Sequence, residues 1–221
     1  MTEDRLYQQI RGKIEEDFAP VKPLKEPWKR ALWIFPLLLL LAGAILAVFH
    51  LRPDASNFTP LELYGFIVLQ VAVCYLLLSA VLKTGIPGSF LSLSSLALPG
   101  VTAAAVFLAA SHVLHRASPN NPPAGQEISM GAACIAIVGI LGAASLVGGF
   151  FLARRGLPFR SGAAGLLLGL CGGLAVEAVW RLHCPFTSWS HVLVFHAGAV
   201  LILAFSGAVF GYLSKQKNHG G

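Results

Sequence analysis

The sequence predicts an all-α, polytopic membrane protein: a bundle of six transmembrane helices with both termini in the cytoplasm. Three observations support this fold class. Of the 221 residues, 56% are hydrophobic and 12% are charged, whereas a soluble domain carries about 25% charged residues. The apolar residues gather in blocks long enough for the roughly 20 helical residues that cross a bilayer. Finally, most basic residues fall on one side of the predicted membrane.

Six apolar blocks follow the first 30 residues. They are residues 31–51, 61–82, 90–114, 128–153, 162–182 and 191–213. The first block begins too late and runs too long for a cleaved signal peptide. The third is rich in serine and contains Pro99 and Gly100. We expect a kinked helix there, because neighbouring helices can satisfy the backbone groups that a proline frees.

The placement of lysine and arginine predicts the orientation. With the N-terminus inside, thirteen of the sixteen Lys and Arg residues fall in the tails or in inner loops. Arg52, Arg116 and Arg181 are the three that fall outside. Cytoplasmic segments carry an excess of basic residues, so both termini are predicted to be cytoplasmic. The net charge of +6 is then explained by topology and lipid headgroups, and we expect no nucleic-acid partner.

These boundaries divide the chain into a cytoplasmic tail with a spacer (1–30), a transmembrane domain (31–214) and a short cytoplasmic tail (215–221). The first tail predicts a short amphipathic helix. Its apolar stripe recurs every four residues and consists of Leu6, Ile10, Ile14 and Phe18. Its polar side mixes acids with bases, which favours docking into a protein groove over lying on anionic lipid. The proline-containing stretch "APVKPLKEPWKR" predicts an extended spacer.

Glycines recur at four-residue spacing in the last two blocks. Gly165, Gly169 and Gly173 lie in the fifth block, and Gly207 and Gly211 lie in the sixth. Small residues at this spacing let two membrane helices approach closely. The pattern therefore predicts a compact bundle and indicates no activity.

Cysteine and histidine gather at the predicted outer end. Cys134 lies near the start of the fourth block, and Cys184 lies beside His183 in the last outer loop. These three are the candidate metal or redox sensing residues. The two thiols are the pair expected to meet, either as a disulfide or as ligands of a soft metal ion. No CxxC or HExxH motif is present, which disfavours a thioredoxin-like or zinc-protease site. His112 and His115, at the end of the third block, are auxiliary candidates.

Glu177 and Arg181 form a charged pair near the outer end of the fifth block. They stand four residues apart and therefore share a helix face. Ionisable residues at membrane depth are costly and often functional. The pair either anchors the loop above it or tunes the site, where Arg181 would lower the pKa of the Cys184 thiol.

Several motifs occur in an order that resembles the NrsF family of bacterial anti-sigma factors. They are "APVKPLKEPWKRALW", Cys134, the stretch from Arg154 to Pro185 that ends in "RLHCP", and "GAVFGYL" in the final span. The resemblance covers nearly the whole chain. His112, His115, Cys74 and Cys171 match no family pattern that we can assign.

The resemblance implies a function. Such a protein would hold an extracytoplasmic-function (ECF) sigma factor at the bacterial cell inner membrane and release it under heavy-metal or redox stress. Two cysteines on the periplasmic side, by position Cys134 and Cys184, would sense the stress. A heavy-metal cation would bind only transiently, with no resident cofactor. The sigma factor would bind the cytoplasmic side, where the N-terminal tail lies.

Two other functions are compatible with six spans. A small transporter or channel would use Glu177, Arg181 and the outer histidines as an entry, but the inner halves of the blocks carry almost no ionisable groups, and paired broken helices are not evident. A haem or quinone enzyme would need facing histidines within the spans, where only His196 lies well inside. With no Walker or G-x-S-x-G motif, we expect no enzymatic activity and name no catalytic residue.

Overall fold

The computed structural model describes residues 3–17, 25–86, 93–123, 125–154 and 162–216, and over these ranges the regular structure is entirely helical. In chain order the longer elements are α1 (Glu3–Asp17), α2 (Pro27–Ala31), α3 (Ile34–Phe49), α4 (Phe66–Lys83), α5 (Leu93–Ala117), α6 (Glu127–Arg154), α7 (Gly162–Trp180) and α9 (Gly198–Gln216). Shorter turns join them: η1 (Ala55–Asn57), η2 (Leu61–Gly65), α8 (Trp189–His191) and η3 (Val192–Ala197).

The six predicted spans are confirmed as helices. Each is long and apolar enough to cross a membrane. Pro99 lies inside helix α5, so the third block is a helix as predicted, and the kink stays a prediction. Two spans are less regular than expected, because the π-helical turns η2 and η3 precede α4 and α9. The orientation of the bundle stays a prediction.

The predicted tail helix is present as α1, which includes Leu6, Ile10 and Ile14, whereas Phe18 lies outside the described residues. The spacer differs from the prediction at its end, where Pro27 begins the helix α2 instead of continuing an extended segment. Proline is well suited to the first position of a helix, because the N–H that it lacks would have no helical partner there.

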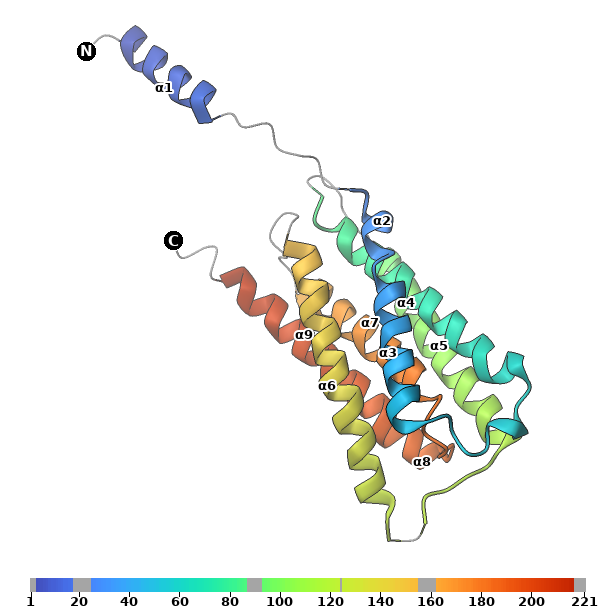
Figure 1. Cartoon of the computed structure of the whole chain (residues 1–221). Coiled ribbons are helices and arrows are strands. Elements are labelled where there is room, and N and C mark those ends of the chain that lie inside the picture. The colour runs from blue at the N-terminus through green and yellow to red at the C-terminus, as the bar shows by residue number, and fades with distance from the viewer. Residues whose placement is uncertain (1–2, 18–24, 87–92, 124, 155–161, 217–221) are drawn as a thin grey trace.

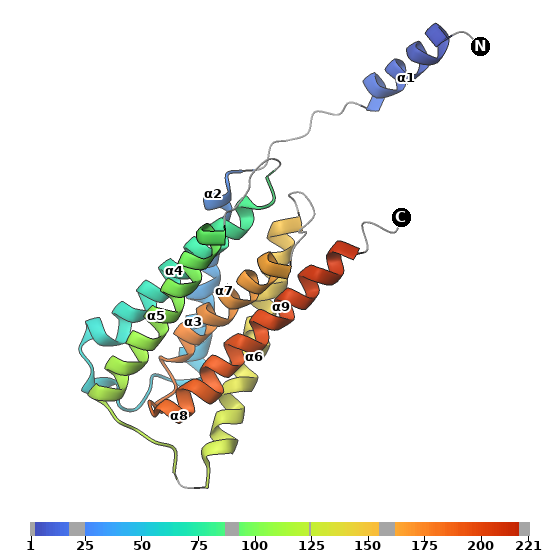
Figure 2. The same ribbon diagram turned by 180° about the vertical axis from the view of Figure 1, so that it is seen from behind.

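Helix α7 lies at the centre of the bundle and packs against α3, α4, α5, α6 and α9 (Figures 1 and 2). Most of its side chains are buried, from Ala164 near its start to Trp180 at its end. The other five spanning helices surround it and leave apolar side chains exposed, as expected for surfaces that face lipid.

The glycine pattern is confirmed as a close contact between α7 and α9. A Cβ atom placed on Gly165 would lie 2.1 Å from the carbonyl oxygen of Gly207, and one on Gly169 would lie 2.1 Å from that of Leu203. Both obstacles are backbone atoms, so the two helices sit at a separation that only glycine permits at these positions.

The loops that follow α3, α5 and α7 meet at one end of the bundle, together with α8 (Figure 1). We call it the outer end, because the distribution of basic residues predicts that it lies outside the cytoplasm. Asp54 accepts hydrogen bonds there from Arg52 Nε at 2.6 Å, Ser118 Oγ at 2.7 Å and Asn120 Nδ2 at 2.9 Å. Arg52 Nη2 also donates to the carbonyl of Pro185 at 3.1 Å. The Arg52–Asp54 pair therefore connects all three loops, with Asp54 contacting the loop after α5 and Arg52 contacting the loop after α7.

Replacing Asp54 with asparagine should destabilise this end of the bundle. Burial acts to raise the pKa of Asp54, but hydrogen bonds from Arg52 and Ser118, with the charge of Arg52, hold that pKa below its ordinary value. A lowered pKa in the folded protein stabilises it above the unfolded pKa of about 3.9. That stabilisation disappears as the pH falls through the folded value.

We therefore expect Asp54→Asn to cost about 2 kcal/mol at pH 7 and to remove part of the acid dependence below about pH 4. Thermal unfolding in detergent at pH 7 and pH 3 measures both effects. A difference from wild type that stays constant between the two pH values would contradict this role for the carboxylate.

Candidate metal or redox site

The two outer cysteines meet inside the protein. Cys134 comes from the second turn of α6, and Cys184 follows the end of α7, where the N–H groups of His183 and Cys184 both donate to the carbonyl of Trp180. The two sulfur atoms lie 3.7 Å apart. Each cysteine is 4% exposed. The positions expected to meet from topology alone therefore do lie together.

Two histidines complete the group. His191 Nε2 lies 3.6 Å from each sulfur. One ring nitrogen of His196 joins it, and the four ligand atoms lie within 4.8 Å of one another. Both rings are buried, at 2% and 1% exposure. We call Cys134, Cys184, His191 and His196 the Cys2His2 group.

The π-helical turn η3 explains why sequence reasoning did not single out these histidines. They stand five residues apart, which in a regular α-helix places two side chains about 140° apart around the axis. A π-helix closes its hydrogen-bonded turn at five residues. His191 and His196 therefore face the same side, with ring centroids 5.3 Å apart. The sequence does contain the two histidines five residues apart, but an α-helix would not place side chains at this spacing on the same face.

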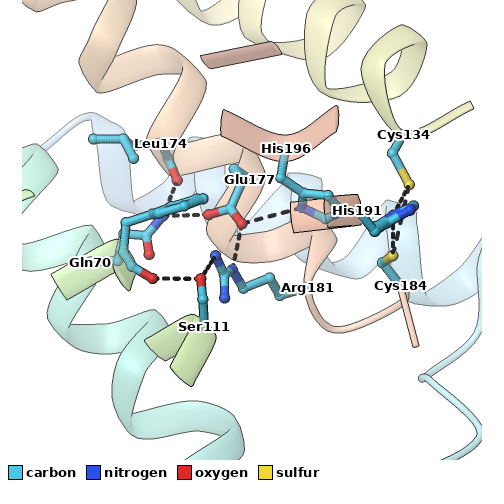
Figure 3. A network of polar contacts seen from close by, with 10 residues as sticks. Gln70, Ser111, Cys134, Leu174, Glu177, Arg181, Cys184, His191 and His196 are labelled. Atoms are coloured by element: carbon cyan, nitrogen blue, oxygen red, sulfur yellow. Dashed lines mark hydrogen bonds and ion pairs between the residues drawn. The ribbon is translucent and has the colours of Figure 1, made fainter. Parts of the chain in front are cut away.

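A buried polar network adjoins the group on the side of α7 (Figure 3). Glu177, which is fully buried, accepts a hydrogen bond from Gln70 Nε2 at 2.6 Å and is ion-paired with Arg181. Arg181 Nη2 donates to Ser111 Oγ at 2.9 Å. The same carboxylate lies 3.3 Å from His196 Nδ1. The predicted Glu177–Arg181 pair thus links α4, α5 and α7 to the histidine of η3.

The other predicted site residues lie apart from the Cys2His2 group. His183 turns away from Cys184, with Nδ1 lying 3.2 Å from the carbonyl oxygen of His50 and its ring packed against Trp180. His112 and His115 lie on α5 near the ring of Trp189. Of the histidines proposed from sequence as metal or redox ligands (His183, His112 and His115), none contributes a ligand atom to this group among the described residues.

The expected effect of Arg181 on Cys184 is wrong. The hydrogen bond shared with Cys134 and burial together raise the pKa of the Cys184 thiol well above its ordinary value. Arg181 interacts instead with Glu177 and Ser111.

The geometry is compatible with two kinds of chemistry. A disulfide would require the sulfurs to move from 3.7 Å to about 2.05 Å. A metal ion would instead enter between the sulfurs and the imidazoles, which are the ligands that soft and borderline cations prefer. In the described part of the chain, the group offers sulfur and nitrogen atoms and lacks a carboxylate ligand, so it does not suit Ca²⁺ or Mg²⁺.

The fold and this group define a polytopic helical membrane protein with paired thiols and imidazoles buried at one end of its bundle. The model of the NrsF family, described as negative regulator of sigma F, matches residues 15–214. The chain therefore belongs to this family, and its class is that of the negative regulators of sigma factors. No curated protein and no solved structure matches the chain.

Proposed function

We propose that this protein is an anti-sigma factor that holds an ECF sigma factor at the bacterial inner membrane and releases it on heavy-metal or redox stress, sensed by Cys134 and Cys184. Family membership supports the sigma-binding half of the proposal. The sensing half depends on one observation, which is that the sulfurs of Cys134 and Cys184 lie 3.7 Å apart inside the protein.

The proposed sensor and the proposed docking segment lie at opposite ends of the bundle. Helix α2, which leads from the N-terminal tail, lies at the end away from α8 and the cysteines (Figures 1 and 2). On α1, Ile10 is 50% exposed, which suits an apolar contact with a partner protein. Sensing would therefore act through the packing of the helices between the two ends.

Helix α7 is suited to carry such a signal, because it precedes Cys184 and packs against all five other spanning helices. A ligand changes the balance between two packings only if it binds one of them more tightly. Moving the ratio from 1:99 to 99:1 takes about 5.5 kcal/mol of differential affinity. Structural metal sites supply about 10 kcal/mol or more of binding free energy, which exceeds the differential affinity that this shift between packings requires.

Oxidation is the other route that the thiol pair supports. Forming a disulfide would transfer two electrons and two protons from Cys134 and Cys184 to an oxidant and join the two sulfurs. The same two helices would be drawn together, because Cys134 lies on α6 and Cys184 directly follows α7. Metal binding and oxidation therefore act on the same part of the bundle.

The transport alternative receives less support. Within the described residues, the buried charged side chains are Arg52, Glu177 and Arg181. All three lie in the outer half of the bundle, and Glu177 and Arg181 form an ion pair with each other. A pathway through the membrane would continue this polarity to the inner end.

Replacing either sensing cysteine should abolish release without abolishing sigma binding. The full chain would be purified from membranes with its bound sigma factor, identified by mass spectrometry, before and after addition of Cd²⁺. Wild type should lose the sigma factor on Cd²⁺ addition, whereas Cys134→Ser and Cys184→Ser should keep it, because each variant lacks one of the paired sulfurs.

Cys171→Ser is the matched control, because Cys171 is equally buried but bonds to the carbonyl of Cys74, away from the Cys2His2 group. It should respond as wild type does. If both sensing variants release the sigma factor normally, the sensor assignment is wrong. If wild type captures no sigma factor at all, the anti-sigma proposal itself is wrong.

A further inference from the structure

Three atoms of the Cys2His2 group already have the spacing of a metal coordination shell. Zinc binds thiolate sulfur at about 2.3 Å and imidazole nitrogen at about 2.0–2.1 Å. In a regular tetrahedron those bonds place two sulfurs about 3.8 Å apart and a sulfur and a nitrogen about 3.6 Å apart. The observed separations are 3.7 Å between the sulfurs and 3.6 Å from each sulfur to His191 Nε2. Cys134, Cys184 and His191 therefore form one face of a tetrahedron of zinc-like dimensions.

His196 lies next to this face, and the four ligand atoms lie within 4.8 Å of one another, so its nitrogen would move inward to occupy the fourth corner. Its Nδ1 faces the carboxylate of Glu177 at 3.3 Å, so its Nε2 is the nitrogen left for a ligand. That Nε2 is buried and has no hydrogen-bond partner. A buried polar atom without a partner is costly and calls for an explanation. Figure 3 shows the His196 ring between Glu177 and the ring of His191, on the side toward the sulfurs.

Glu177 is placed to orient this ligand. A metal-binding histidine commonly donates its other ring N–H to a carboxylate, which fixes the tautomer and aims the free lone pair at the metal. Glu177 has that position relative to His196, and Gln70 and Arg181 hold the carboxylate in turn. Glu177 would therefore orient His196 without binding the metal itself.

Charge balance also favours a divalent cation at this site. Binding a divalent cation displaces one proton from each thiol, and the two thiolates then neutralise the two positive charges while both imidazoles stay neutral. The loaded site carries no net charge, which suits side chains that are 1–4% exposed. Four protein ligands also leave no open coordination position, so the site would bind a metal without catalysing a reaction.

We propose that Cys134, Cys184, His191 and His196 form a closed, tetrahedral site for a borderline or soft divalent cation of the Zn²⁺ and Cd²⁺ class, with Glu177 positioning His196. This inference deepens the proposed function and rests on it only for the consequence of binding, since binding itself is measured without a sigma factor. A cavity of about 10 Å³ is lined in part by Cys184 and His196. This volume is close to the smallest that holds one water, so the ion would sit directly between the four ligand atoms and not in a larger cavity beside them.

Cobalt(II) is the probe that tests the geometry, because thiolate-to-cobalt charge transfer and intense visible bands distinguish tetrahedral sulfur-containing sites. The reduced full chain in detergent should bind one Co²⁺ per chain, show these bands, and lose them when Zn²⁺ or Cd²⁺ is added. His191→Ala and His196→Ala should each weaken binding at least tenfold and change the visible bands, because each removes a corner. Cys171→Ser should bind as wild type does.

Glu177→Gln should weaken Co²⁺ binding by about 10- to 100-fold while keeping the tetrahedral bands, because all four ligands remain. Circular dichroism and gel filtration confirm that each variant is folded, and His183→Ala serves as a second folded control that should bind normally. If the double variant His191→Ala/His196→Ala binds Co²⁺ with wild-type affinity and spectrum, the four-ligand site is wrong.

The two proposals fail in different ways. Tetrahedral Co²⁺ binding by a chain that keeps its sigma factor when Cd²⁺ is added would overturn the sensing function and leave the metal site standing. Release of the sigma factor by Cd²⁺ from the His191→Ala/His196→Ala variant, with wild-type dose dependence, would overturn the histidine ligation and leave sensing by the cysteines standing.

Discussion

Replacing Gly169 with alanine should separate α7 from α9 and destabilise the whole bundle. The new Cβ would lie 2.1 Å from the carbonyl oxygen of Leu203 and 2.7 Å from its carbonyl carbon. Backbone atoms cannot swing away as the end of a flexible side chain can, so the helices must move apart along their contact. Overpacking of this kind costs typically 1–3 kcal/mol and occasionally more. We expect the upper end of that range, about 3 kcal/mol, for this variant.

Gly43→Ala is the matched control, because Gly43 also lies inside a spanning helix and has no atom within 4 Å of the position of a new Cβ. There the substitution should be neutral or slightly stabilising, since alanine favours helix over glycine. Thermal unfolding in detergent, followed by circular dichroism, compares the two variants. Equal melting temperatures for Gly169→Ala and Gly43→Ala would show that the backbones of α7 and α9 do not approach as closely as the structure indicates.

Replacing Glu177 with alanine should be the most damaging change of a single charged residue. It removes the ion-pair partner of Arg181, which is 6% exposed, and the acceptor for Gln70. Breaking a buried pair by removing one partner costs about 3–5 kcal/mol, because an uncompensated charge stays in the low-dielectric interior. We expect a loss of stability in that range, measured as the free energy of unfolding in detergent.

The double variant Glu177→Ala/Arg181→Ala tests the reason for this loss. It removes both charges, so it should be more stable than Glu177→Ala alone. Glu26→Ala provides the contrast, because the Glu26–Lys29 pair is largely exposed and exposed pairs contribute little. If the double variant is no more stable than the single one, the unpaired Arg181 charge is not the cause of the damage.

The six spans could be predicted because membrane helices are selected by a single local property. Twenty consecutive apolar residues are needed to cross the hydrocarbon region, so length and composition identify each span without knowledge of its neighbours. The boundaries agree to within a few residues; for example, the block predicted at 128–153 is α6 (Glu127–Arg154). Glycine spacing likewise predicted close helix packing, because small residues at four-residue intervals form a flat helix face. The structure alone shows that the two glycine-containing helices, α7 and α9, pack against each other.

Part of the site was also predictable. Cys134 and Cys184 lie near the same predicted end of two consecutive spans, so topology alone brings them to one end of the bundle, and they do meet. The i, i+4 rule likewise predicted the pairing of Glu177 with Arg181, which the structure contains. Sequence proximity misled at His183, which is adjacent to Cys184 in the chain but lies against the carbonyl of His50.

What the sequence by itself determined is therefore the set of membrane helices, the end of the bundle at which thiols collect, and the charged pair beside them. Only the tertiary structure decided that His191 and His196 join the cysteines, because a π-helical turn brings side chains five residues apart to one face. It also decided that Glu177 serves His196 as well as Arg181. These contacts depend on how α4, α6, α7 and η3 pack together, and a local sequence pattern does not determine the distances between helices.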